Sequence, residues 1–380
     1  MTRKLLTIAM LLLVVGCLPI DLSVSSDGRV LIPRAEGFFT YNPATGELLK
    51  VTGSNDGEPA FGLFMPDGKS MILVTNQSEG GMGGQFTYKL RTPDGKSRDL
   101  HTASNTTYAT VSPDGKYVAV ARLSEQQTPG FNQNLPEITL VNIADGSAKP
   151  LVSNVISLHR WSPDGKSLLV VQLKSKSDKR DIYAGTLQLL NIADGSVKPL
   201  ANVVGPQGAF FDLSPDGKQA VFTALLAAPS SAKDQPQLPA EGDDDNDNQR
   251  QATHLFTLDI AAGKLTQLRD DVKYVRFSPD GKHVLIAADE SNGLAKLEVV
   301  DAAFKDSRLI ASDAAVSAGG GGFGPGTDIY PTFLNNNTIL YIAQRAVYGS
   351  SGKNMMLTTV SLDGATRKIH QPAIDAGILK

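Results

Sequence analysis

The chain lacks most of the residues and patterns that mark catalytic or metal-binding chemistry. Its 380 residues include one cysteine, one tryptophan and five histidines. It contains no cysteine pair, no H-E-x-x-H, no G-x-S-x-G and no phosphate-binding glycine loop. The glycine-rich stretch Gly319–Gly326 has no following Lys-Ser or Lys-Thr, which is typical of a plain loop. The sequence thus carries no signature of a zinc peptidase, a serine hydrolase or a nucleotide-binding enzyme.

An excess of charge is also missing. The net charge is −3 and no basic block stands out, which argues against nucleic acid as a partner. The apolar stretch Leu5–Val15 is too short to span a bilayer. Glycine and proline, by contrast, occur 36 and 21 times, and they indicate many turns rather than long helices.

The first residues resemble the signal of a bacterial lipoprotein. Arg3 and Lys4 precede the apolar stretch, which ends in Val-Val-Gly and then Cys17. In such a lipobox the signal peptide is cut off before the cysteine, whose attached lipid chains hold the protein on a membrane. Residues 1–16 are therefore expected to be a signal peptide, Cys17 the lipid attachment site and residues 17–21 a short tether.

The alternative is an ordinary secretory signal with an incidental cysteine. Leu18, rather than an aspartate, follows Cys17. The lipoprotein resemblance then implies sorting to the outer membrane of the cell envelope, on its periplasmic or its surface face. With Cys17 lipidated, no thiol remains for a disulfide.

One short string recurs along the chain and predicts the fold. Proline presets the first turn position, aspartate bonds its own backbone and glycine accepts positive φ, so the string is a tight hairpin turn. Regular recurrence of such a turn is typical of a repeat protein. The copies are Met65–Lys69, Ser112–Lys116, Ser162–Lys166, Ser214–Lys218 and Ser278–Lys282, with worn copies at Ser25–Gly28 and Leu334–Asn337.

The segments around each turn complete a four-stranded unit. A short strand ending in a large apolar residue precedes the turn, and an apolar, β-branched run follows it. A third strand, a second tight turn and a fourth strand come next. This pattern predicts an all-β chain, a single β-propeller of about seven four-stranded blades, with six or eight as alternatives. The expected blades are 22–52, 58–102, 106–153, 156–202, 208–270, 273–312 and 328–371, with an insertion at 227–251 and a tail at 372–380.

The repeats resemble those of the TolB-like, WD-repeat-like propeller family over nearly all of residues 20–371. The resemblance implies the fold and says little about function. The chain departs from TolB in its lipobox, in its larger number of repeats and in lacking an N-terminal α/β domain. Similar repeats precede the hydrolase domain of prolyl-oligopeptidase-like enzymes, and no such domain fits in this chain.

Loop lengths differ between the two faces of the expected disc. The turns within the hairpins are tight, whereas the loops after each second strand and between blades are long. We call these two sides the hairpin face and the long-loop face. Since loops on a rigid fold often carry function, the long-loop face is the predicted binding face. Its longest segments are Gln77–Gln85, Leu123–Glu137, Leu173–Thr186, Ala227–Thr253 and Ser312–Ile329.

The innermost strands supply the candidate binding residues. Mostly aromatic residues stand four positions before the turn and polar residues, several of them charged, two before it. This predicts an aromatic-rimmed funnel suited to a peptide, a glycan or a carboxylate. Alternatively, the aromatics are packing between blades and the charges are internal ion pairs. The candidates are Tyr108, His159, Arg160, Asp212, Tyr274, Arg276 and Tyr330.

Metal-binding signals are weak, and no cofactor is expected. Asp243, Asp245 and Asp247 are spaced like a calcium loop, but Asn248 replaces the required glycine and His254 the bidentate glutamate. A solvated insertion is the preferred interpretation of this segment.

These features favour a membrane-anchored interaction scaffold of the envelope, which binds a protein, peptide or glycan through the long-loop face. The short tether favours partners that are themselves membrane-bound. One alternative is a metal-dependent polysaccharide lyase or hydrolase, for which His159 is the single supporting feature. The other is a sensor that binds a small molecule in the central channel.

Overall fold

The computed structural model describes residues 19–34, 36–52, 57–77, 84–128, 130–131, 134–177, 182–206, 210–225, 253–289, 294–315, 328–344 and 355–370. The predicted signal peptide, Cys17, the aspartates 243, 245 and 247 and much of the long loops lie outside these residues. All regular elements within the described ranges are strands. In this part of the chain no helix is long and apolar enough to cross a membrane.

Antiparallel units follow one another along the first half of the chain. The short strand β1 (Pro19–Asp21) precedes them. Unit 1 contains β2 (Val30–Arg34), β3 (Gly37–Asn42) and β4 (Glu47–Lys50). Unit 2 contains β5 (Glu58–Phe64), β6 (Met71–Asn76), β7 (Gln85–Arg91) and β8 (Ser97–Ser104). Unit 3 contains β9 (Thr106–Val111), β10 (Tyr117–Leu123), β11 (Pro136–Asn142) and β12 (Ala148–Ser153).

The same order continues to the end of the described chain. Unit 4 contains β13 (Arg160–Trp161), β14 (Ser167–Lys176), β15 (Ile182–Asn191) and β16 (Val197–Pro206). Unit 5 contains β17 (Phe211–Leu213), β18 (Gln219–Leu225), β19 (Thr253–Asp259) and β20 (Lys264–Asp270). Unit 6 contains β21 (Val272–Phe277), β22 (His283–Asp289), β23 (Ala295–Asp301) and β24 (Ser307–Ala314). After β25 (Asp328–Tyr330), unit 7 contains β26 (Thr332–Asn335), β27 (Thr338–Gln344), β28 (Met355–Ser361) and β29 (Arg367–His370).

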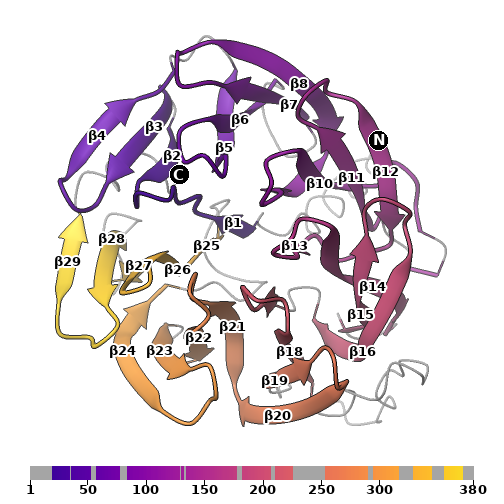
Figure 1. Cartoon of the computed structure of the whole chain (residues 1–380), viewed down its shortest axis with the longest axis vertical. Helices are drawn as coiled ribbons and strands as arrows, with labels where there is room; N and C mark the ends of the chain where they lie inside the picture. The colour runs from indigo at the N-terminus through magenta and orange to yellow at the C-terminus, as the bar shows by residue number, and fades with distance from the viewer. Residues whose placement is uncertain are drawn as a thin grey trace, which may run out of the picture.

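The units stand in a ring around one axis, with the first strand of each nearest the centre (Figure 1). The predicted all-β propeller is confirmed. The count of seven blades stays a prediction, because unit 1 has three paired strands and its inner segment makes only an isolated bridge, Val24 to Val30. Units 6 and 7 are moreover joined into one sheet by the pair Ala314 and Ala343.

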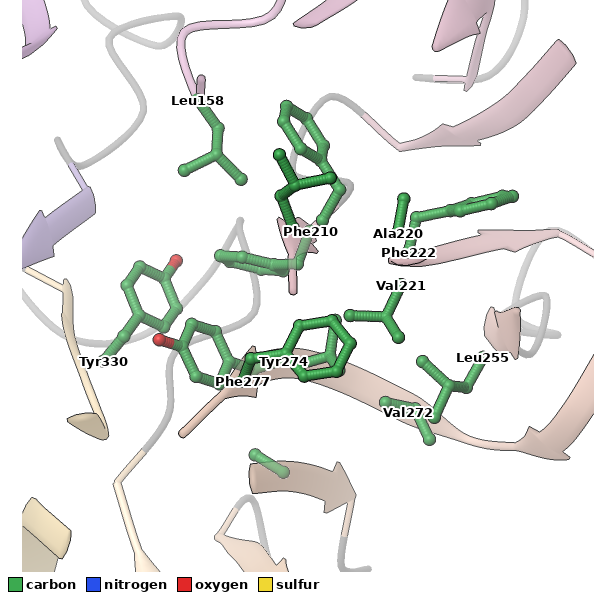
Figure 2. Packing of buried hydrophobic residues seen from close by; sticks show 14 of the residues in the cluster. Leu158, Phe210, Ala220, Val221, Phe222, Leu255, Val272, Tyr274, Phe277 and Tyr330 are labelled. Atoms are coloured by element: carbon green, nitrogen blue, oxygen red, sulfur yellow. The ribbon is translucent and has the colours of Figure 1, made fainter. Parts of the chain in front are cut away.

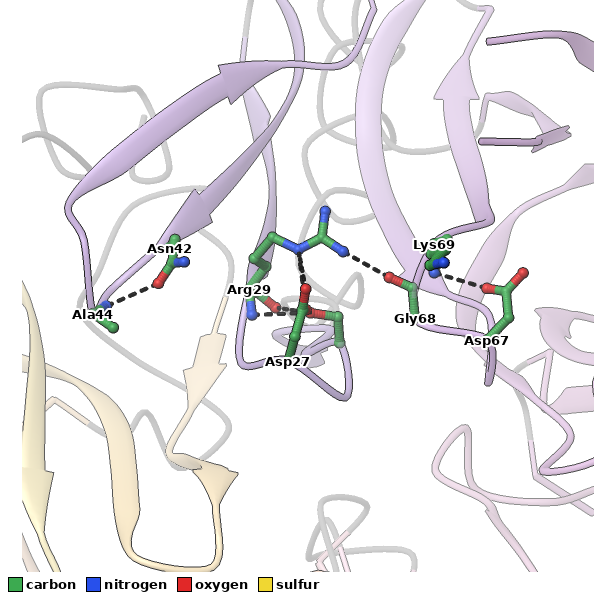
Figure 3. A network of polar contacts seen from close by, with 8 residues as sticks. Asp27, Arg29, Asn42, Ala44, Asp67, Gly68 and Lys69 are labelled. Carbon is green, nitrogen blue, oxygen red and sulfur yellow. Dashed lines mark hydrogen bonds and ion pairs between the residues drawn. The ribbon is translucent and has the colours of Figure 1, made fainter. Parts of the chain in front are cut away.

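Side-chain and backbone hydrogen bonds fix the recurring first turn. In unit 3, Ser112 Oγ donates to Asp114 Oδ1 over 2.7 Å and accepts from Tyr117 N over 2.9 Å. Gly115 lies at φ +70°, where an L-residue is strained. In the worn copy of unit 1, Arg29 pairs with Asp27 and donates to the carbonyl of Gly68 in the next unit over 2.8 Å (Figure 3). The turn string therefore serves contacts between units as well as chain reversal.

The core lies between neighbouring sheets. The second strand of each unit packs against sheets on both sides, which explains its uninterrupted apolar run. In β10, for example, Val118, Ala119, Val120 and Ala121 are all at most 1% exposed.

The ring closes between units 1 and 7 without exchange of a strand between their described sheets. Tyr41 of β3 hydrogen-bonds His370 Nδ1 of β29 over 2.7 Å, and Lys368 Nζ donates to Pro43 O over 3.0 Å. Burial lowers the pKa of His370 to about 4, so its imidazole is neutral at pH 7. The second imidazole nitrogen, Nε2, hydrogen-bonds with Thr359 Oγ1. We call this contact the seam. At the axis, β1 pairs in parallel with β25.

Two nearly identical second turns give a matched test of packing between units. Gly146 and Gly195 both stand in Asn-Ile-Ala-Asp-Gly-Ser at φ +75° and +74°. A Cβ at Gly146 would overlap the Leu100 carbonyl oxygen of unit 2, whereas one at Gly195 would meet nothing within 4 Å. We expect Gly195→Ala to lower the free energy of unfolding by about 1 kcal/mol through the positive φ, and Gly146→Ala by about 2 kcal/mol more through overpacking.

Urea unfolding of the two variants beside the wild-type chain measures this difference. Equal losses in both variants would show that the hairpin of unit 3 does not press on unit 2.

Candidate functional site

A cavity of about 750 Å³ lies on the axis of the ring. Residues of every unit line it, mostly from the last positions of the inner strands. First-turn residues also contribute, among them Ser26, Pro215, Pro279 and Asn336. Because these turns form the hairpin face, the cavity lies at that end of the channel. We call it the hairpin-face cavity.

Among the described residues, three charged side chains line this cavity: Arg160 at the start of β13, Asp212 in β17 and Arg276 in β21. All three stand two positions before a turn serine, where the alternation of the inner strand points side chains toward the axis. The two guanidinium groups and one carboxylate of the described lining give a formal sum of +1. The lining therefore favours an anionic group over a cationic one.

Asp212 joins neighbouring units at the cavity wall. Its Oδ2 accepts from Phe277 N of unit 6 over 2.8 Å, and its Oδ1 accepts from Leu213 N over 2.9 Å. Arg160 of unit 4 lies with its Nε 3.4 Å from Asp212 Oδ1 and donates from its Nη1 to the hydroxyl of Tyr108 in unit 3. This network of polar contacts, from Tyr108 through Arg160 and Asp212 to Phe277, spans four units. It holds the Arg160 side chain in place before any ligand arrives.

The aromatic residues form a floor rather than a rim. Phe210, Tyr274 and Tyr330 pack on one another with ring centroids 4.7–5.2 Å apart, and the two tyrosine rings are parallel within 3°. All three are buried, and Figure 2 shows them side by side with Leu158 nearby. Since each stands four residues before the first residue of its turn string, they lie roughly 13 Å from the turns along the strand. They fit the packing alternative considered for the sequence, as the Arg160–Asp212 pair fits an internal ion pair.

His159 is buried in the wall between units. Its Nδ1 lies 3.0 Å from Ser157 O and its Nε2 3.2 Å from Ala119 O, and its ring meets Tyr108 edge-on at 5.1 Å. Burial lowers its pKa to about 4. Both nitrogens face backbone carbonyls, so His159 would have to leave its pocket to bind a metal. Among the described residues, no three His, Cys, Asp or Glu side chains gather as a metal site.

The structure thus brings Tyr108, Arg160, Asp212 and Arg276 together at one cavity and places His159, Tyr274 and Tyr330 in the packing around it. Sequence reasoning missed the contribution of the turns themselves and of Trp161, which lines the cavity and donates to Thr110 O over 3.4 Å. The available signal was the position of Trp161 directly before a turn serine. The predicted long-loop site stays a prediction, because much of those loops lies outside the described residues.

Comparison with known proteins supports the fold. No family model and no curated protein matches the chain. An oligogalacturonate lyase in complex with manganese aligns with a TM-score of 0.61 and 12% identity over 85% of each chain. A periplasmic gluconolactonase of Pseudomonas aeruginosa gives 0.51 and 17% over 90% of this chain and 94% of its own. TolB from Acinetobacter baumannii gives 0.49 and 16% over 89% and 77%.

The chain is a β-propeller. Identities this low show the fold alone, so the activities in those names are not transferred. The repeats resemble those of TolB-like proteins, but membership of that particular family stays a prediction.

The buried His159 predicts a defined pH dependence of stability. Its pKa is about 4 in the folded protein and about 6.5 in an unfolded chain. Between these values the unfolded chain binds a proton that the folded chain does not, so stability falls as the pH falls from 7 to 4. The histidine accounts for about 3 kcal/mol of that fall.

We expect His159→Gln to be less stable than the wild type at pH 7 and to lose about 3 kcal/mol less between pH 7 and pH 4. Urea unfolding at several pH values measures both quantities. His370 contributes to the same window in both proteins, so the difference isolates His159. Parallel pH profiles for the two proteins would contradict the assigned protonation state.

Proposed function

We propose that this chain is a membrane-tethered binding protein of the bacterial envelope, whose site is the hairpin-face cavity. The observation that carries the proposal is the cavity itself, on the axis, with a net positive lining held by a hydrogen-bonded network. Its volume of about 750 Å³ lies within the usual range for ligand sites, about 300–1,000 Å³.

The chemistry of the lining suggests the class of ligand. Arginine is suited to carboxylates because its planar fork of donors matches two carboxylate oxygens. Arg276 is half-buried in the wall, and Trp161 adds an aromatic surface against which a sugar ring or an apolar side chain packs. The ligand is therefore a peptide or a glycan that carries a carboxylate.

The location rests on the sequence. The lipobox-like segment before Cys17 supports export and lipid attachment, with the outer membrane as the proposed site. Partners that bind through the long-loop face, including membrane-bound proteins, belong to a separate scaffold function. The cavity gives that second function no support.

Thermal unfolding of the full chain with acidic and neutral ligands tests the proposed site. Oligogalacturonides and peptides with free or amidated C-termini are suitable probes. We expect the acidic members to raise the melting temperature and their neutral counterparts to have little effect. Arg276→Gln removes a charged hydrogen-bond donor, which should weaken binding roughly tenfold or more.

Arg308→Gln is the matched control, because Arg308 is an exposed arginine on the outer strand β24. It should leave binding unchanged. If no acidic ligand stabilises the protein, or if both variants lose binding equally, the cavity is not the site.

A further inference from the structure

We infer that the hairpin-face cavity opens away from the membrane, while the membrane-facing end of the channel is closed. The ligand then arrives from the aqueous compartment rather than from the bilayer. The inference rests on the lipid attachment and the cavity site proposed above, and it adds the direction from which that site is reached.

The direction of the inner strands shows which end of the channel lies at the long-loop face and which at the hairpin face. Every inner strand runs from the long-loop face to its first turn on the hairpin face, as β9 does before Ser112–Lys116. The inner segment of unit 1, Leu22–Val24, runs the same way into the turn at Ser25–Gly28. Residues that precede these segments consequently lie at the long-loop end.

The strand β1 occupies that end of the channel. It directly precedes Leu22 and pairs in parallel with β25, the short strand before the inner strand of unit 7. In this pairing Pro19 lies opposite Asp328, and Asp21 lies opposite Tyr330. Both strands lie near the centre of the ring in Figure 1, and β1 also contacts β9 of unit 3. Part of the segment expected as the short tether, residues 19–21, is therefore paired with β25 near the axis.

The aromatic floor lies below the cavity on the same side. Tyr330 is the last residue of β25, and its ring stacks on Tyr274 and meets Phe210. The pair β1–β25 and this cluster lie near the axis between the cavity and the long-loop end, on the side of units 5 to 7. A ligand in the cavity thus has its entry at the hairpin face.

The lipid attachment site is close to the closed end. One residue, Leu18, separates Cys17 from the start of β1 at Pro19, so the Cα atoms of Cys17 and Pro19 are at most about 7 Å apart. Lipid chains on Cys17 bring the long-loop face to the membrane. The hairpin turns lie a strand length away, since the seven residues of β10 extend about 23 Å.

Fluorescence quenching on vesicles tests this orientation. Acylated Cys17 leaves no free thiol in the chain, so a single introduced cysteine can be labelled specifically. Gln126→Cys marks the long-loop side of unit 3 and Lys116→Cys the hairpin turn of the same unit; both native residues are exposed. The labelled full-length lipoprotein is reconstituted into phosphatidylcholine vesicles that contain a lipid with a nitroxide headgroup.

We expect a strong loss of fluorescence for the label at position 126 and little loss for the label at position 116. Lys282→Cys, on the hairpin turn of unit 6, controls for a tilted disc and should also remain bright. Quenching of either hairpin label as strong as that at position 126 would overturn the inference. A full-length chain that fails to float with the vesicles would overturn it as well.

A second readout separates this inference from the proposed function. Any acidic ligand found by thermal unfolding should bind the vesicle-bound protein as tightly as the detergent-solubilised protein. Binding in detergent that is lost on vesicles would overturn the orientation and leave the cavity site intact. If the quenching pattern is as expected but no acidic ligand binds, the proposed function is overturned and the orientation is left intact.

Discussion

The centre of this ring depends on the hydrogen bonds and the ion pair that the Asp212 carboxylate makes. It is 9% exposed, and it accepts hydrogen bonds from two backbone amides while it pairs with Arg160. Removing it would take this counter-charge from a buried guanidinium and the acceptor from an amide of unit 6, which is far costlier than losing an exposed ion pair. One side chain thereby couples the geometry of three units to the shape of the cavity.

The repeated string made the architecture predictable. Pro-Asp-Gly marks each reversal, and the apolar runs that follow it mark the strands buried on both sides. The structure places strands where these signals occur, for example Tyr117–Leu123 after Ser112–Lys116 and His283–Asp289 after Ser278–Lys282. Local chemistry sufficed here because each hairpin is specified by residues that are close in sequence.

The contacts inside the channel, between the aromatic rings and between β1 and β25, were not predictable in the same way. Alternation along a strand shows that Tyr274 and Tyr330 face the axis, but it does not show whether the aromatic rings of neighbouring units meet there. Their contact depends on the diameter of the whole ring. The parallel pairing of β1 with β25 joins residues more than 300 positions apart, and no turn motif in the sequence predicts it. The position of Arg160, Asp212 and Arg276 at the cavity wall follows from their place two residues before the turn, which is a local property.

The seam and the pair β1–β25 together have a mechanical consequence. Backbone pairing joins the start of the described chain to the segment before unit 7 at the hub of the ring, whereas at the rim the last and first units are held by side chains such as Tyr41, His370 and Lys368. Among the described residues, a separation of the rim would break these side-chain contacts and the apolar packing beneath them. The hub would act as the pivot of such a movement, so the ring could widen at its circumference while its ends stay fastened near the axis.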